Sequence, residues 1–122
     1  RFRAVFSFGP ADDVAGYGPD FLPFDTSNSR EIELRSPGHW LASIRSPTFV
    51  FEGTLRGNLD SLQAMARSST NPKAHFLAVQ GADHFNILAP TNRLIAGKVL
   101  RDDGPTCNFT FAEEELSRPF AK

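Results

Sequence analysis

Cysteine is nearly absent from this sequence, since Cys107 is the single one in 122 residues. An intrachain disulfide is therefore excluded, which favours a reducing compartment, and we expect a cytoplasmic protein. Three widely spaced histidines and one cysteine cannot form a zinc site. A glycine-rich phosphate loop and a G-x-G-x-x-G motif are also missing, so the sequence predicts neither a metal nor a cofactor.

Long apolar runs and an excess of positive charge are lacking as well. No segment stays apolar over the roughly 20 residues that a transmembrane helix needs. The formal net charge is −1, and lysine and arginine are scattered along the chain. We therefore expect neither a nucleic acid nor a membrane as a partner.

The composition that remains is typical of a folded domain. Hydrophobic residues make up 40% of the chain and charged residues 22%, which argues against disorder. The twelve phenylalanines are assigned to core packing. The length suits one domain over residues 1–122.

Three short apolar segments predict β-strands. Residues 47–53, PTFVFEG, are the clearest, because consecutive apolar side chains suit a central parallel strand that is covered on both faces. The other strands are expected at 2–8 and 74–81. An irregular excursion follows the first strand and holds two short helical pieces, within 29–37 and 37–44.

Two longer helices are expected after the second and third strands. The first should begin with Asn58 as its N-cap and end near residue 67. The second should span about residues 90–102, with an inward stripe formed by Leu94, Ile95, Lys98 and Val99. The tail over 107–116 suggests an edge strand and a helical turn.

Strands that alternate with helices predict right-handed crossovers, a parallel sheet and the α/β class. In such sheets, ligands bind at the carboxyl ends of the strands. Three loops leave those ends here, with the sequences GPADD, EGTLRGN and GADHFN. Polar residues that lie in or beside these loops should gather at one edge of the sheet: Asp12, Asp13, Glu52, Asp60, Asp83 and His84.

Three stretches in this order carry a resemblance: RSPGHWLASIRSPTFVFEG (35–53), HFLAVQGADHF (75–85) and LAPTNRLIAGKVL (88–100). Together they resemble the C-terminal part of α/β-hydrolases of the prolyl-oligopeptidase-like or dienelactone-hydrolase-like kind. The resemblance covers nearly the whole chain. It implies a partial α/β-hydrolase fold, three-layer α/β/α with a mainly parallel sheet, that contains the last three strands and their helices.

The resemblance also implies acyl transfer by a serine, a histidine and an acid, which follow one another in that chain order. It makes His84 the general base. The family's nucleophile motif, G-x-S-x-G, does not occur in the sequence. Ser36 and Ser46 each precede a proline and are assigned to structural turns. We therefore expect the nucleophile to lie upstream of this chain.

The acid of the triad departs from the family pattern, as the nucleophile does. The family usually has this acid three residues after the glycine that ends the penultimate strand. Arg56 occupies that position here, and arginine cannot accept a hydrogen bond from an imidazole. The alternatives are Asp12 and Asp13, from the loop after the previous strand, and Asp60, which is explained as a first-turn helix residue. Glu52 would serve only if its side chain pointed out of the end of its strand.

Two interpretations remain open. The chain is the C-terminal portion of a serine hydrolase that acts on a small ester or peptide and is inactive alone, or it is a non-catalytic relative that binds a small molecule or a protein. In both cases the strand at 2–8 should present an unpaired apolar edge, so we expect self-association through that edge or poor solubility.

Overall fold

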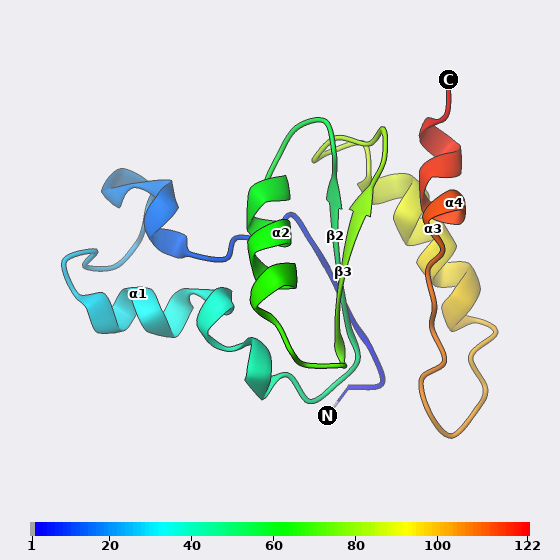
Figure 1. Cartoon of the computed structure of the whole chain (residues 1–122), viewed down its shortest axis with the longest axis horizontal. Coiled ribbons are helices and arrows are strands. Elements are labelled where there is room, and N and C mark those ends of the chain that lie inside the picture. Colours follow the sequence, from blue (N-terminus) through cyan, green and yellow to red (C-terminus); the bar gives the residue numbers. More distant parts are fainter. Residues whose placement is uncertain (1) are drawn as a thin grey trace.

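The computed structural model describes residues 2–122, and its centre is a three-stranded parallel sheet (Figure 1). The strands are β1 (Val5–Phe8), β2 (Thr48–Gly53) and β3 (Ala74–Val79), in the spatial order β1-β2-β3. β2 is thus the central strand, as its continuous apolar run predicted. The parallel sheet and the α/β class are confirmed.

Strand register divides the side chains between the two faces of the sheet. Phe6 pairs with Phe49 and Phe8 with Phe51, so these four rings project from the same face, because side chains alternate along a strand. The rings stack in pairs across the two strands, with centroids 5.7 Å apart for the first pair and 5.2 Å for the second. This face forms the main hydrophobic core.

Helix α3 (Leu88–Val99), the extended segment over 107–112 and helix α4 (Glu113–Ser117) cover this phenylalanine face. Ile95 of α3 and Leu116 of α4 are buried in the core. Phe111 lies with its ring edge toward Phe51, 5.1 Å between centroids. The tail therefore completes the core with alternating aromatic side chains, although no strand forms within it, and the expected edge strand was wrong.

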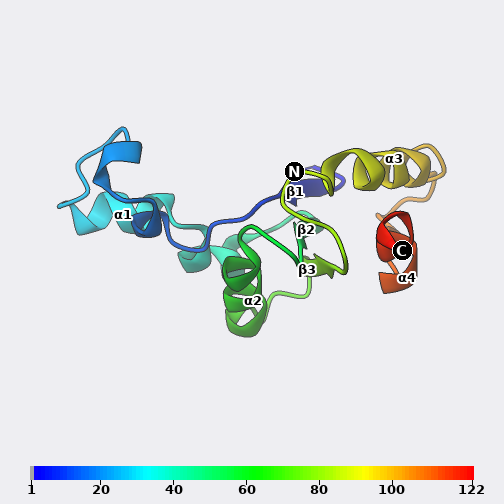
Figure 2. The same ribbon diagram turned by 90° about the horizontal axis from the view of Figure 1, so that it is seen from above.

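Helix α2 (Leu59–Ser68) packs on the opposite face of the sheet, as the view from above shows (Figure 2). Leu62 and Met65 are its buried residues, and Val50 of β2 is buried as well. Helices thus lie on both sides of the sheet. Within residues 2–122, no helix combines the length and the apolar character needed to cross a bilayer.

The expected helices differ from the structure in two details. Asn58 is the N-cap residue of α2, as expected, but its side chain makes no capping hydrogen bond; it donates instead toward the carbonyl of Gly9. In α3 the stripe reaches Ile95 but not Val99, which is 48% exposed, and Thr91 is buried in its place. The buried face therefore runs through Thr91 and Ile95, which are one turn apart, and Val99 is the last residue of the helix.

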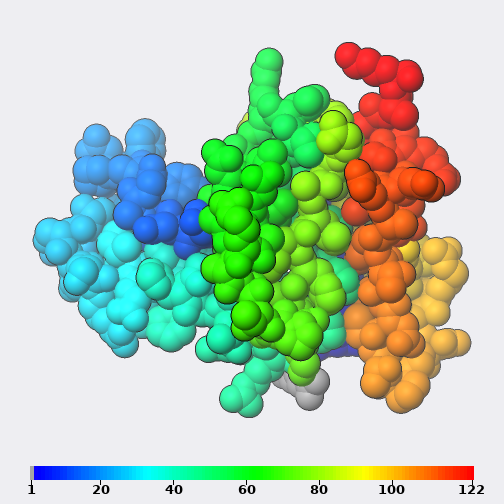
Figure 3. All heavy atoms as spheres, viewed as in Figure 1, coloured from blue at the N-terminus to red at the C-terminus, as the bar shows by residue number. Residues whose placement is uncertain are grey.

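The excursion between β1 and β2 extends away from the sheet (Figures 2 and 3). It contains α1 (Ser29–Arg35) and four short 3-10 helices: η1 (Val14–Tyr17), η2 (Pro19–Phe21), η3 (Pro37–His39) and η4 (Leu41–Ser43). A fifth, η5 (Arg118–Phe120), follows α4. Ser36 is fully buried and accepts from the N–H of Val14, which confirms its assignment to a structural turn.

Candidate active site at the carboxyl ends of the strands

Three loops meet at the carboxyl ends of the parallel strands. The backbone N–H of Leu55 donates to Ala82 over 3.0 Å, and that of His84 donates to Arg56 over 2.9 Å. These bonds join the β2–α2 loop to the β3–α3 loop. The loop that follows β1 joins them at Gly9, whose N–H donates to the carbonyl of Phe51 in β2 over 3.2 Å.

The central feature of this edge is a contact between His84 and Glu52. Nδ1 of the imidazole lies 2.8 Å from Oε2 of the carboxylate. The Glu52 side chain is fully buried, whereas the His84 side chain is 32% exposed. A carboxylate can only accept a hydrogen bond, so Nδ1 carries the proton and Nε2 is left as the acceptor of the neutral ring.

The Glu52 carboxylate is also held by the backbone. Its Oε1 accepts from the N–H of Gly53 over 2.8 Å, and its Oε2 accepts from the N–H of Asn58 over 3.1 Å. A buried charge is tolerated only when its oxygens have such partners. Three donors around one buried carboxylate therefore hold it in place, and this carboxylate in turn orients the imidazole.

Two glycines with positive φ make room for the ring. Gly9 has φ +62°, and a Cβ there would lie 2.5 Å from Cε1 and 3.2 Å from Nε2 of His84. Gly57 has φ +126°, and a Cβ there would lie 2.9 Å from Nδ1 and 3.1 Å from Cδ of Glu52. The imidazole is therefore packed between the backbones of two loops, and only glycine fits at either position.

The loop that carries His84 is braced by the preceding residue. One carboxylate oxygen of Asp83 accepts from the N–H groups of Phe85 and Asn86, each over 2.8 Å. The N–H of Asp83 donates in turn to the Asn86 side chain over 2.8 Å. The hydrogen bond that the Asp83 carboxylate accepts from the backbone of Asn86, followed by the one from Phe85, holds the pKa of this carboxyl below its ordinary value. Asp83 therefore stabilises the turn.

The three acids expected as partners of His84 are engaged elsewhere. Asp12 accepts from the hydroxyl of Ser61 over 2.7 Å. Asp13 accepts from the N–H of Ala15 and so caps η1. Asp60 lies in the first turn of α2. Within residues 2–122, none of the three bonds to His84, and the carboxylate at the imidazole is that of Glu52.

The sequence carried a weak signal for Glu52. It is the last residue before the glycine that ends β2, and side-chain alternation puts it on the α2 face together with Val50. A carboxylate in an apolar strand must have buried partners. That requirement predicts a partner for Glu52 but does not say which residue provides it.

The other histidines have structural surroundings. His75 stacks on Phe49 with ring centroids 4.8 Å apart, and His39 ends η3. Among residues 2–122, no group of three or more histidine, cysteine or acidic side chains could hold a metal ion.

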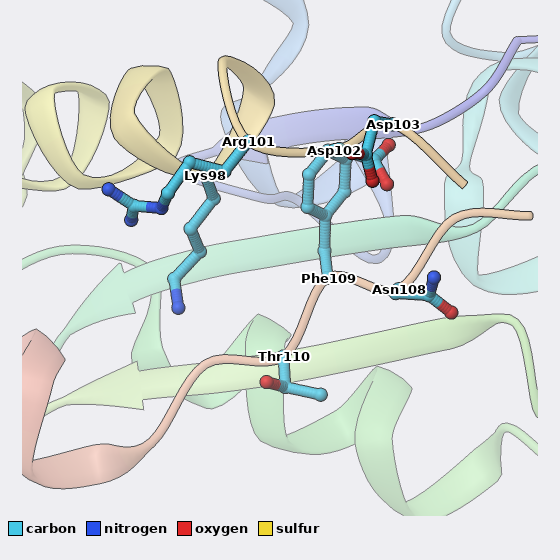
Figure 4. Close-up of a pocket in the computed structure, with 7 residues that line it drawn as sticks. All are labelled: Lys98, Arg101, Asp102, Asp103, Asn108, Phe109 and Thr110. Carbon is cyan, nitrogen blue, oxygen red and sulfur yellow. The ribbon is translucent and has the colours of Figure 1, made fainter.

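Several cavities open on the described part of the chain, and two of them are lined by clusters of polar residues. One of about 250 Å³ adjoins His84 and is lined by Arg56, Gly57, Asn58, Asp83, His84 and Phe85. The other, of about 230 Å³, lies between the end of α3 and the tail (Figure 4). Asp102, one of its lining residues, bonds to Arg3 just before β1, so this cavity lies toward the amino end of that strand. The first cavity is therefore the one that belongs to the candidate site.

Comparison with known proteins gives no match: no protein-family model matches the chain, and neither a curated protein nor a solved structure is significantly similar to it.

Proposed function

We propose that this chain provides the base and the acid of a hydrolytic acyl-transfer site. His84 is the general base, and Glu52 is the acid that orients it. The hydrogen bond from Nδ1 of His84 to the fully buried Glu52 carries the proposal, because it leaves Nε2 ready to take a proton from a nucleophile.

In the proposed reaction, a serine hydroxyl loses its proton to Nε2 of His84 while its oxygen bonds to the carbonyl carbon of an ester or amide. The imidazolium is stabilised by the Glu52 carboxylate and then gives the proton to the alcohol or amine, which leaves as its bond to the carbonyl carbon breaks and an acyl-enzyme remains. Water repeats these steps on the acyl-enzyme. The sequence contains no G-x-S-x-G, so we place the serine in a segment of the protein outside these 122 residues.

The test is labelling by a fluorophosphonate, which reacts with activated serines. We expect the complete product of the coding region to be labelled at a serine outside the 122 residues. His84→Ala and Glu52→Gln should each slow labelling by about 10²-fold or more. His39→Ala removes an exposed histidine of η3 and serves as the matched control. Labelling that survives His84→Ala at the normal rate would refute the proposal.

A second candidate function is binding without catalysis. Arg56 stands where the resemblance implies the acid, and this departure favours a decayed site. A complete product that folds but does not react with the fluorophosphonate would favour this candidate.

A further inference from the structure

Arg56 adjoins the candidate base but has no part in the proposed proton transfer. Its backbone carbonyl accepts from the N–H of His84 over 2.9 Å, which fixes its position next to the imidazole loop. Its side chain is exposed, and it lines the cavity of about 250 Å³ that His84 also lines. Figure 3 shows the β2–α2 loop projecting at the top of the molecule.

The guanidinium of Arg56 has unused donors. Within residues 2–122, its side chain makes neither an ion pair nor a hydrogen bond. In the described part of the chain, the lysines and arginines that form ion pairs are Arg3, Arg30, Arg35 and Lys98, and Arg56 is not among them. A planar guanidinium offers parallel N–H groups that match the two oxygens of a carboxylate.

Asp83 is the acidic residue that lines the same cavity. One of its oxygens already accepts from two backbone N–H groups, those of Phe85 and Asn86. That oxygen is thereby committed to the turn. After these backbone hydrogen bonds, the charge of Arg56 makes a smaller contribution to lowering the pKa of the Asp83 carboxyl, but the two side chains form no ion pair among residues 2–122. The cationic donors of Arg56 are therefore available to a ligand.

The cavity also has an apolar wall. The ring of Phe85 is 78% exposed and lies edge-on to the imidazole of His84, with centroids 5.0 Å apart. Ligand sites combine apolar surface with a small number of polar groups that fix orientation. Phe85 provides the apolar surface, and Arg56 provides the polar group.

We infer that Arg56 and Phe85 form a subsite beside His84 for a small ligand that carries a carboxylate and an apolar group. The inference rests on the proposed function in one respect, because it makes this ligand part of the substrate. It names the substrate class as esters or amides with a free carboxylate near the bond that is cleaved. Arg56 acts as a specificity-determining residue.

Binding is tested on the 122-residue chain by following its backbone amide NMR signals. The probe is phenylacetate, and phenylacetamide is the neutral control of the same shape. We expect phenylacetate to shift the amides of Gly57, His84 and Phe85, and to bind at least about fivefold more tightly than phenylacetamide. Added salt should weaken phenylacetate binding because the site is exposed.

Variants assign the effect to the guanidinium. Arg56→Gln should weaken phenylacetate binding by about fivefold or more and leave phenylacetamide binding within about twofold. Arg56→Lys keeps the charge without the planar fork and should be intermediate. Arg93→Gln removes an exposed arginine on α3 and should leave binding unchanged. The amide spectra of all variants report directly whether the fold is kept.

The outcomes separate this inference from the proposed function. Equal affinity for the two probes, or a Kd for phenylacetate that Arg56→Gln does not change, overturns the carboxylate subsite. Neither result depends on a nucleophile, so fluorophosphonate labelling of the complete product can succeed independently. If phenylacetate binds as expected but the complete product is not labelled, the subsite stands and the chain belongs to a binding protein.

Discussion

A Cβ on Gly9 would lie 2.5 Å from Cε1 of His84, so the imidazole occupies the space that any larger residue at position 9 would need. The two residues are far apart in sequence and belong to loops after the first and third strands. Their contact shows that the end of β1 shapes the site, although β1 contributes no charged side chain to it.

Gly9→Ala should therefore displace the imidazole and destabilise the protein. A left-handed conformation costs a non-glycine residue about 1–2 kcal/mol, and the contact with His84 adds to this cost. We expect the free energy of unfolding in urea to fall by about 1–3 kcal/mol and the NMR signals of the His84 ring to shift. Gly16→Ala is the control, because nothing lies within 4 Å of a Cβ there. Equal stability of the two variants would contradict the packing described.

Glu52→Gln tests how the buried carboxylate is held. The amide keeps the size of the side chain but places an NH2 group against donors that now bond to carboxylate oxygens. An unmatched buried donor costs about 1–3 kcal/mol, and we expect a loss of that size in the free energy of unfolding. Urea unfolding of Glu33→Gln is the comparison, since Glu33 pairs with Arg30 at the surface, where ion pairs contribute little. The interpretation fails if Glu52→Gln is as stable as that control.

The acid sensitivity of the fold should depend on Asp102. This carboxylate bonds to Arg3 and ties the start of the chain to the end of α3. Its hydrogen bond with Arg3 lowers the pKa of Asp102 below the ordinary value of 3.8. The unfolded chain therefore binds the proton more tightly, and the stabilisation is present above pH 3.8 and lost as pH falls through the lower, folded-state pKa.

Thermal unfolding between about pH 6 and pH 2 measures this dependence. Asp102→Asn should lower the melting temperature at the upper end of the range and little at the lower end, where the wild-type carboxyl is protonated. Asp20→Asn, at an exposed position in η2, should leave the profile unchanged. A constant difference between Asp102→Asn and the wild type at every pH would argue against the titration of Asp102.

Self-association through β1 remains a prediction. Among residues 2–122, β1 pairs only with β2, so its outer edge has backbone groups available to another strand. We expect sedimentation to show concentration-dependent association, and we expect Val5→Lys to weaken it because charge on an edge strand opposes pairing. Ala15→Lys adds the same charge in the excursion and should have no effect. A monomer at all concentrations would end this prediction.

Much of the fold followed from local patterns. The apolar run over 47–53 predicted β2 as a central parallel strand, and Gly53 ended it as expected. Strand and helix alternation predicted the parallel order, because parallel strands need a crossover between them. The tail was predicted less well: Phe109 and Phe111 pack on the rings of Phe6 and Phe49, and such packing does not require the hydrogen bonds of a strand.

The sequence by itself determined the α/β class, the edge at which the loops gather and the position of His84 in a loop after β3. Tertiary structure alone decided which carboxylate meets its imidazole. Glu52 and His84 are 32 residues apart, and their contact depends on the parallel register of β2 and β3 and on the two glycines that admit the ring. Local preferences act over a few residues, whereas a buried carboxylate finds its partner only when separate loops are brought together. No sequence window could therefore have shown that Glu52, rather than Asp12, Asp13 or Asp60, meets the imidazole of His84.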